Sequence, residues 1–332
     1  MEPIVISASP HIHSRDNIKR IMYDVVIAMI PAVLLSFYLF GLNALITFTV
    51  AVGACLFFEY ALQKWLLKTP TTLSDGSALI TGILLALNLP SSLPIWMTIV
   101  GALFAIGIAK ISFGGLGANI FNPALVGRVF LLVSFPVQMT RWPIPGEGRF
   151  SLDAVTGATA LGKLKDGLRA DANITELLAE IPSQWQMFAG MEGGSMGEVS
   201  VIALLIGGLY LLYRKVITWH IPVAVLGSMF VFSGIMWLFN METQADPFFH
   251  IIAGGAILGA FFMATDMTTS PMSAKGMIIF GIGIGVITML IRLYGAYPEG
   301  ISFAILIMNA FVPLLDRYIK PRRFGELKKV KV

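Results

Sequence analysis

Ten long apolar stretches constrain the fold of this chain more than any other feature. A helix needs about 20 predominantly apolar residues to cross a bilayer, and these stretches are too uniformly apolar for the alternating strands of a membrane barrel. Only 13% of the 332 residues are charged, roughly half the share of a soluble domain. We therefore expect an all-α polytopic membrane protein. The predicted spans cover residues 21–40, 43–62, 76–89, 95–111, 120–136, 198–213, 221–239, 249–266, 276–293 and 300–315.

The lysine and arginine residues predict how the spans are oriented. Arg15, Lys19 and Arg20 precede the first span, and short basic segments stay on the cytoplasmic side of a membrane. With an even number of spans, both termini are then cytoplasmic, and we expect a bacterial cytoplasmic (inner) membrane protein. The membrane explains the basic residues, so no nucleic-acid partner is expected. The other residues predicted inside are Lys64, Lys68, Lys110, Arg214, Lys215 and Lys275.

This topology divides the chain into two membrane halves of five spans each, with a long outer loop between them. "GSALITGILLALNLPSSLP" in the first half can be laid on "GAILGAFFMATDMTTSP" in the second, which indicates an internal repeat. The third span has only about 14 residues, roughly 21 Å of helix, so we expect it to end inside the bilayer or to turn back. The predicted segments are 1–20 (cytoplasmic), 21–136 (first half), 137–197 (outer loop), 198–316 (second half) and 317–332 (basic cytoplasmic tail).

Ionisable residues inside spans are costly and often functional. Arg128 lies about nine residues into the fifth span, too deep to reach water easily, and we expect it to have a buried partner. Four other charged residues lie near span ends and are predicted to be interfacial anchors: Asp24, Glu59, Asp75 and Arg292.

Asn119 and Asn122 lie one turn apart near the inner surface, and Asp266 ends the eighth span, which descends to the same depth. These polar residues from opposite halves are therefore expected to converge. They could cap helix ends and tie the halves together, or they could bind a ligand; the residues alone leave both open. Four scattered histidines and the single Cys55 predict neither a metal site nor a disulfide.

The stretch "SLDAVTGATALG" lies in the outer loop. Gly157 and Ala158 are small and leave room around the Thr159 hydroxyl, but a plain turn explains such residues equally well. The stretch also resembles the flavinylation motif D-x-x-[ST]-G-A-[ST], and Asp153, Thr156 and Thr159 fill its defined positions. In that motif a dedicated transferase joins FMN, taken from FAD, to the last hydroxyl through a phosphodiester, outside the cytoplasm.

The resemblance extends over the whole chain. "SASPHIHSRDNIKRIMYDVVIAMIPA", "DGSALITGILLALNLP", "GGLGANIFNPALVGRVFLLVSFPVQMT" and "GAFFMATDMTTSP" are similar to the family of D subunits of Rnf ion-translocating electron-transport complexes. The B subunits of sodium-translocating NADH:quinone reductases are a sister group with a longer N-terminal extension. The chain departs from the family pattern after Asp266, where a proline is expected and Met267 stands.

The resemblance implies a membrane flavoprotein subunit of a redox-driven Na+ or H+ pump. Thr159 would carry FMN covalently, and a non-covalent riboflavin would contact Asn119, Asn122 and Asp266. Ferredoxin and NAD would act at the partner subunits A, B, C, E and G, and no side chain of this subunit is expected to be catalytic. Arg128 and Asp24 are candidates for the ion path.

Two other functions remain open at this point. The repeated halves and the short third span also suit a solute channel or transporter, which has no need of a flavin. A scaffold subunit would share the partners but carry no cofactor. Covalently bound flavin separates the first function from both alternatives.

Overall fold

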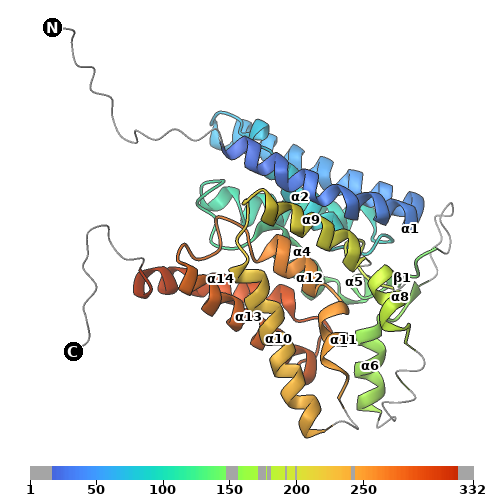
Figure 1. Ribbon diagram of the computed structural model, residues 1–332. Coiled ribbons are helices and arrows are strands. Elements are labelled where there is room, and N and C mark those ends of the chain that lie inside the picture. The colour runs from blue at the N-terminus through green and yellow to red at the C-terminus, as the bar shows by residue number, and fades with distance from the viewer. Residues whose placement is uncertain are drawn as a thin grey trace, which may run out of the picture.

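A computed structural model describes residues 17–146, 156–170, 177, 181–190, 193–198, 200–240 and 244–320. The described chain is almost entirely helical (Figure 1). Each of the ten predicted spans coincides with apolar helix, and five helices are long enough to cross a membrane, so the all-α polytopic fold is confirmed. Most of the predicted N-terminal segment and basic tail, and Asp153 of the flavinylation motif, lie outside the described residues.

The first half contains the helices α1 (Ile18–Ala61), α2 (Ser77–Leu87), α3 (Ile95–Leu103) and α4 (Pro123–Ser134). Short π- or 3-10 turns extend or link them: η1 (Leu62–Leu67), η2 (Leu73–Asp75), η3 (Phe104–Ile108) and η4 (Ile111–Phe113). The loop between the halves holds α5 (Pro136–Met139), β1 (Trp142–Pro143), β2 (Thr156–Gly157), α6 (Ala160–Arg169) and α8 (Gln184–Ala189). The second half contains α9 (Val201–Tyr213), α10 (His220–Phe239), α11 (Pro247–Ile252), α12 (Ala256–Leu258), η5 (Gly259–Met263), α13 (Ala274–Tyr294) and α14 (Ile301–Tyr318).

The element α1 is a hairpin of two antiparallel helices, the first two predicted spans. Gly41 has φ 62° and ψ −135°, a backbone conformation that only glycine adopts without strain. The rings of Phe37 and Phe48 lie 5.2 Å apart, whereas eleven residues of straight helix would separate them by about 16 Å. The two legs run side by side in Figure 1.

The hairpin and the other helices give the bundle two distinct ends. At one, the Lys110 end, Lys110 pairs with Glu59 and Asp24 with Arg214. At the other, the Thr159 end, the Gly146 N–H donates to the Leu39 carbonyl, and β1, α6 and α8 gather (Figure 1, right). The first leg of α1 separates the two ends by about 22 Å between residues 24 and 39. The assignment of the Lys110 end to the cytoplasm remains a prediction.

Two helices are broken inside the bundle. α2 stops after 11 residues and ends at Asn88, which is fully buried, so the short third span is confirmed. The eighth predicted span, 249–266, is helical but broken: residues 253–255 interrupt it, with Gly254 at φ 69°. Such irregular backbone is tolerated at membrane depth only where protein surrounds it.

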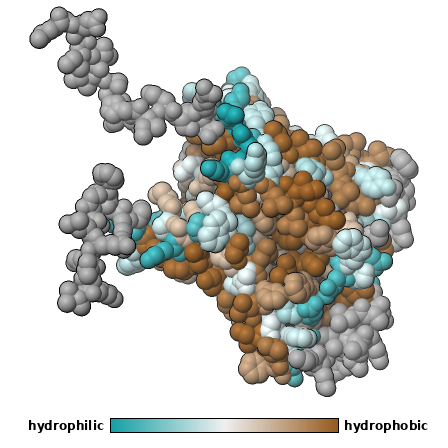
Figure 2. All heavy atoms as spheres, viewed as in Figure 1, coloured by the Kyte–Doolittle hydropathy of each residue, from teal (hydrophilic) through white to brown (hydrophobic). Residues whose placement is uncertain are grey.

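One large apolar core extends over both halves and includes Leu85, Leu125, Leu204 and Phe280, and two smaller apolar clusters lie beside it. Outside this core, a broad hydrophobic band crosses the visible face of the molecule, and hydrophilic residues gather toward its ends (Figure 2). This distribution is the one expected of a surface that faces lipid or other membrane subunits.

Candidate functional site

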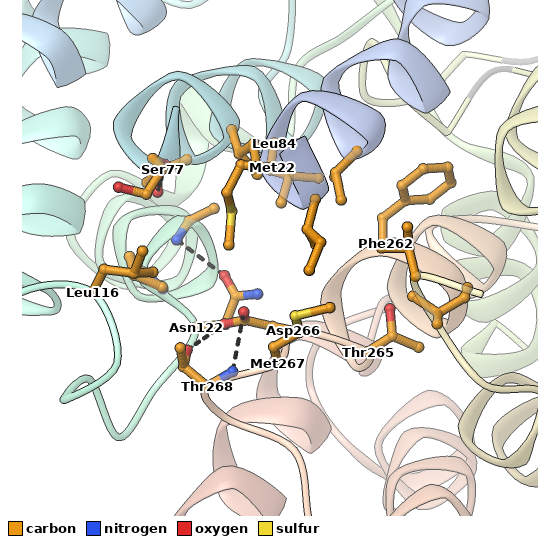
Figure 3. Close-up of a pocket in the computed structure, with 18 of the residues that line it drawn as sticks. Met22, Ser77, Leu84, Leu116, Asn122, Phe262, Thr265, Asp266, Met267 and Thr268 are labelled. Atoms are coloured by element: carbon orange, nitrogen blue, oxygen red, sulfur yellow. Dashed lines mark hydrogen bonds between the residues drawn. The ribbon is translucent and has the colours of Figure 1, made fainter. Parts of the chain in front are cut away.

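A small cavity of about 80 Å³ lies at the Lys110 end, between α1, α2, the start of α4 and η5. Its volume is below the roughly 300–1,000 Å³ of most small-molecule sites, so a ligand as large as a flavin requires the lining side chains to move. The walls are mainly apolar and include Met22, Leu84 and Phe262, which surround the hollow in Figure 3. The lining has the polarity for a flat aromatic ligand with a few polar atoms.

The three predicted polar residues Asn119, Asn122 and Asp266 all line this cavity. Asn122 caps α4, its side-chain oxygen accepting from the Ala124 and Leu125 N–H groups at 3.1 and 3.3 Å, and its amide donates to the Met263 carbonyl at 3.2 Å. The structure thus brings together segments 141 residues apart. Contact of these three residues with a flavin stays a prediction.

Asp266 and Asn119 differ in how many of their polar atoms have hydrogen-bond partners within the protein. The Asp266 carboxylate accepts from the Thr268 and Thr269 hydroxyls at 3.1 and 3.2 Å, and Figure 3 shows it beside Asn122. Asn119 donates to the Thr268 hydroxyl at 3.0 Å, but its side-chain oxygen is buried without a partner among the described residues. A buried acceptor without a donor is costly, so Asn119 fits a ligand that donates a hydrogen bond, as the flavin imide N–H does.

A buried ion pair forms one wall of the cavity. Lys110 Nζ donates to the Glu59 carboxylate at 2.7 Å and to the Ser77 hydroxyl at 2.6 Å. The other Glu59 oxygen accepts from the Thr72 hydroxyl at 2.9 Å. Beyond this pair lies an open cleft of about 1090 Å³ lined by Gln63, Thr72 and Asp75 among others.

Thr159 lies at the opposite end of the bundle, as the N-cap of α6. Its hydroxyl oxygen accepts from the Gly162 N–H at 3.0 Å. The preceding residues Thr156 and Gly157 form β2, which pairs antiparallel with β1. The expectation of open space around the hydroxyl is wrong for the chain as described: Thr159 is only 6% exposed, because α6 packs its first turn against a small apolar cluster.

α6 is docked on the second half of the chain by its apolar face and by two basic side chains. Its residues Leu161 and Leu164 pack with Phe249 of α11. Lys165 donates to the carbonyls of Ile291 and Tyr297 at 3.2 and 2.8 Å. Burial, together with the Arg169 charge, lowers the pKa of the Lys165 ammonium group. The position of Thr159 is therefore fixed relative to α13.

Arg128 has the buried partners that its depth in the span predicts. Its guanidinium donates to the Asn88 side chain at 2.7 Å and to the Ser302 hydroxyl at 3.0 Å. It also pairs with Glu198, at 3.2 Å, and with Glu299. The two acidic partners lie in loops of the second half, and no sequence pattern had singled them out.

Three of the four predicted interfacial anchors are buried, which corrects that expectation. Glu59 is fully buried on Lys110, and Arg292 donates to the carbonyls of His250 and Ala253. Asp24 pairs with Arg214 at 2.8 Å and accepts from the Tyr210 hydroxyl. Their nearness to span ends suggested water contact, but the bundle supplies partners at that depth.

Comparison with known proteins places the whole chain among membrane redox subunits. The model of the NQR2, RnfD, RnfE family matches residues 5–325. The chain is 45% identical, over 96% of each sequence, to the D subunit of a proton-translocating ferredoxin:NAD(+) oxidoreductase complex from Clostridium ljungdahlii. It is also 45% identical, over 98% of this chain and 96% of the relative, to the D subunit of the Na(+)-translocating complex from Acetobacterium woodii. The D subunit of an ion-translocating oxidoreductase complex from Erwinia tasmaniensis is 38% identical, over 97% of this chain and 98% of its own length.

Proposed function

The chain belongs to the NQR2, RnfD, RnfE family, and on that basis we propose that it is the flavin-bearing D subunit of an ion-translocating ferredoxin:NAD+ oxidoreductase complex. FMN is held covalently on Thr159 at one end of the bundle, and riboflavin is held non-covalently in the cavity at the Lys110 end. When bound, the isoalloxazine rings supply the redox chemistry. The chain itself positions the two rings and sets their surroundings.

The observation that carries this proposal is the place of Thr159 at the N-terminus of a ten-residue helix. The positive end of a helix dipole and its free N–H groups favour a phosphate group. A phosphodiester on the Thr159 oxygen would lie beside the Gly162 N–H, which already donates to that oxygen.

The burial of the Thr159 hydroxyl has a consequence for maturation. A flavin transferase cannot reach an oxygen that is buried at the start of the docked α6, so it must act before α6 docks or while this segment is locally open. Elements outside the main core open at lower free energy than the core itself. The proposal therefore includes a transferase that meets the segment in an undocked state.

The cavity supports the second flavin through its mainly apolar lining and its unsatisfied Asn119 oxygen. Asn122 and Asp266 offer further polar groups on the same side (Figure 3). We assign ferredoxin and NAD to partner subunits. Moving one charge against 100 mV requires about 2.3 kcal/mol, and the redox reaction must supply at least this amount for each Na+ or H+ moved.

The test is flavin fluorescence in a denaturing gel, with the chain produced together with its transferase. Wild-type chain should fluoresce, Thr159→Ala should be dark, and Thr159→Ser should regain fluorescence because it keeps the hydroxyl. Thr140→Ala, which removes an exposed hydroxyl bonded to the Pro136 carbonyl, is the matched control and should stay fluorescent. A dark wild-type chain would leave the flavin-free transporter or scaffold as the better function.

A further inference from the structure

Arg128 leaves some carboxylate oxygens of its two acidic partners without a hydrogen bond. Arg128 reaches one oxygen of Glu198 and one of Glu299. The second oxygens, Oε2 of Glu198 and Oε1 of Glu299, are buried and have no hydrogen-bond partner among the described residues. Most buried polar atoms in proteins are hydrogen-bonded. Two unsatisfied carboxylate oxygens in one cluster therefore require a specific reason.

A neutral side chain next to the cluster, the Ser195 hydroxyl, is also unsatisfied. Ser195 is completely buried, and its hydroxyl also has no hydrogen-bond partner among the described residues. The Glu198 N–H donates to the Ser195 carbonyl at 3.1 Å, so both side chains come from one tight turn. The cluster thus presents three uncommitted oxygens, of which only two are acidic.

The neighbouring backbone is shaped around the Glu198 carboxyl. A Cβ on Gly255 would lie 2.7 Å from Glu198 Oε1, so a larger residue here would push against the Glu198 carboxyl. The break at residues 253–255 therefore faces the cluster. Breaks in membrane helices commonly mark ion sites, because the irregular backbone must line a cavity or be covered by protein.

The charges in and around the cluster are balanced closely enough for it to bind and release one added cation. Glu198, Glu299 and Arg128 together carry one net negative charge. Arg292 also acts on Glu299, but its guanidinium is bonded to two carbonyls at the C-terminal end of α11, where the helix dipole favours a positive charge. One small cation would neutralise the triad, and Arg292 limits the cost of losing that cation.

The cluster lies between the two proposed flavin positions. Toward the cavity, Arg128 bonds to Asn88, whose amide contacts the Met263 sulfur, and Asn122 donates to the carbonyl of the same methionine. Toward Thr159, a Cβ on Gly254 would lie 3.7 Å from the Glu299 side chain and 2.9 Å from Leu161, in the first turn of α6. A cation held here would feel the charge of both flavins.

We propose that Glu198, Glu299 and Ser195, held on Arg128, form a reversible binding site for one small monovalent cation with oxygen ligands. The ligand is a proton shared by the two carboxyl groups or a sodium ion held by the carboxylate and hydroxyl oxygens; hard cations of either kind prefer oxygen. The site rests on the proposed function, because it is assigned to the ion that the complex moves. It explains why the buried acid pair has free oxygens while the Lys110–Glu59 pair has both carboxylate oxygens bonded.

The experiment measures binding at equilibrium in the purified, flavin-loaded complex, without turnover. One arm records the infrared carboxyl signal as pH is changed in sodium-free buffer, and the other titrates radioactive sodium at fixed pH. Wild-type complex should show one exchangeable carboxyl proton or one bound sodium ion per copy of this chain. Glu198→Gln and Glu299→Gln should each abolish that signal, and Ser195→Ala should weaken sodium binding about tenfold if sodium is the ligand, roughly one lost ligand contact.

Asp246→Asn is the matched control. It removes a half-buried acid outside the cluster and keeps an N-cap for α11, so it should leave both signals unchanged. A signal that persists in both glutamine variants, or a wild-type complex with neither signal, overturns the cation site. In-gel fluorescence of the same samples tests the proposed covalent flavin separately, because loss of the cation site leaves the flavin on Thr159 in place.

Discussion

The two ends of the bundle would hold their flavins in opposite ways. The Lys110 end offers a small apolar-lined cavity with an unsatisfied amide oxygen but no hydroxyl marked for attachment. The Thr159 end offers a hydroxyl at a helix N-terminus, and neither the cavity nor the open cleft at the Lys110 end reaches it. A ligand in a cavity is retained by burial and hydrogen bonds, whereas a ligand outside any cavity needs another anchor.

This difference would give a physical reason for the covalent attachment that we propose at one site only. A ring on α6 would stay near the bundle surface, accessible to redox partners, without the buried contacts that would otherwise retain it. A ring in the cavity would be enclosed by α1, α2, α4 and η5 and would need no covalent bond. Each of the following predictions tests whether the two ends depend on different interactions.

The largest expected effect is that of Arg128→Met, because this residue connects both ends. It would strand Glu198 and Glu299 as buried carboxylates, and breaking a buried ion pair in this way costs about 3–5 kcal/mol. Thermal unfolding of the purified chain in detergent should show a large loss of stability. Arg128→Met combined with Glu198→Gln and Glu299→Gln should recover much of it; a triple variant as unstable as the single one would contradict this reason.

Asn122→Asp should affect the Lys110 end alone. Aspartate keeps the acceptor oxygen that caps α4 but cannot donate to the Met263 carbonyl or to a ligand. We expect non-covalent flavin affinity to fall by about 1–3 kcal/mol, the cost of one unpaired buried group, with covalent fluorescence unchanged. Flavin released by gentle denaturation is the measurement. Equal loss of both flavins would show that the two ends are not independent.

Lys165→Met should have the smallest effect, and at the Thr159 end alone. It removes the two hydrogen bonds that tie α6 to the carbonyls of Ile291 and Tyr297, each worth about 1 kcal/mol or less at a partly exposed site. Limited proteolysis near α6 should become faster while the released flavin stays constant. The control is Lys163→Met, which replaces an exposed lysine on the same helix. The protease should cut this variant at the wild-type rate.

The sequence predicted the membrane fold well because apolar length is a local property. All ten spans coincide with apolar helix, and the convergence of Asn119, Asn122 and Asp266 followed from depth alone. The motif around Thr159 was also readable, since it lies within seven residues of one loop.

What the sequence did not predict depends on packing between distant segments. Glu198 and Glu299 lie 70 and 171 residues from Arg128, and their loops look like ordinary polar connections. The depth of Arg128 did signal that buried partners must exist somewhere. The burial of Thr159 was missed because the small residues beside it say nothing about the docking of α6 on α11.

The most direct measurement is a flavin count on a single sample of mature chain, divided into the flavin released by denaturation and the flavin retained on peptides. We predict one riboflavin released per chain and one FMN retained, with the added mass on the peptide that contains Thr159. Retention of FMN on another peptide, or a chain from which all flavin is released, would contradict two flavins held in two different ways.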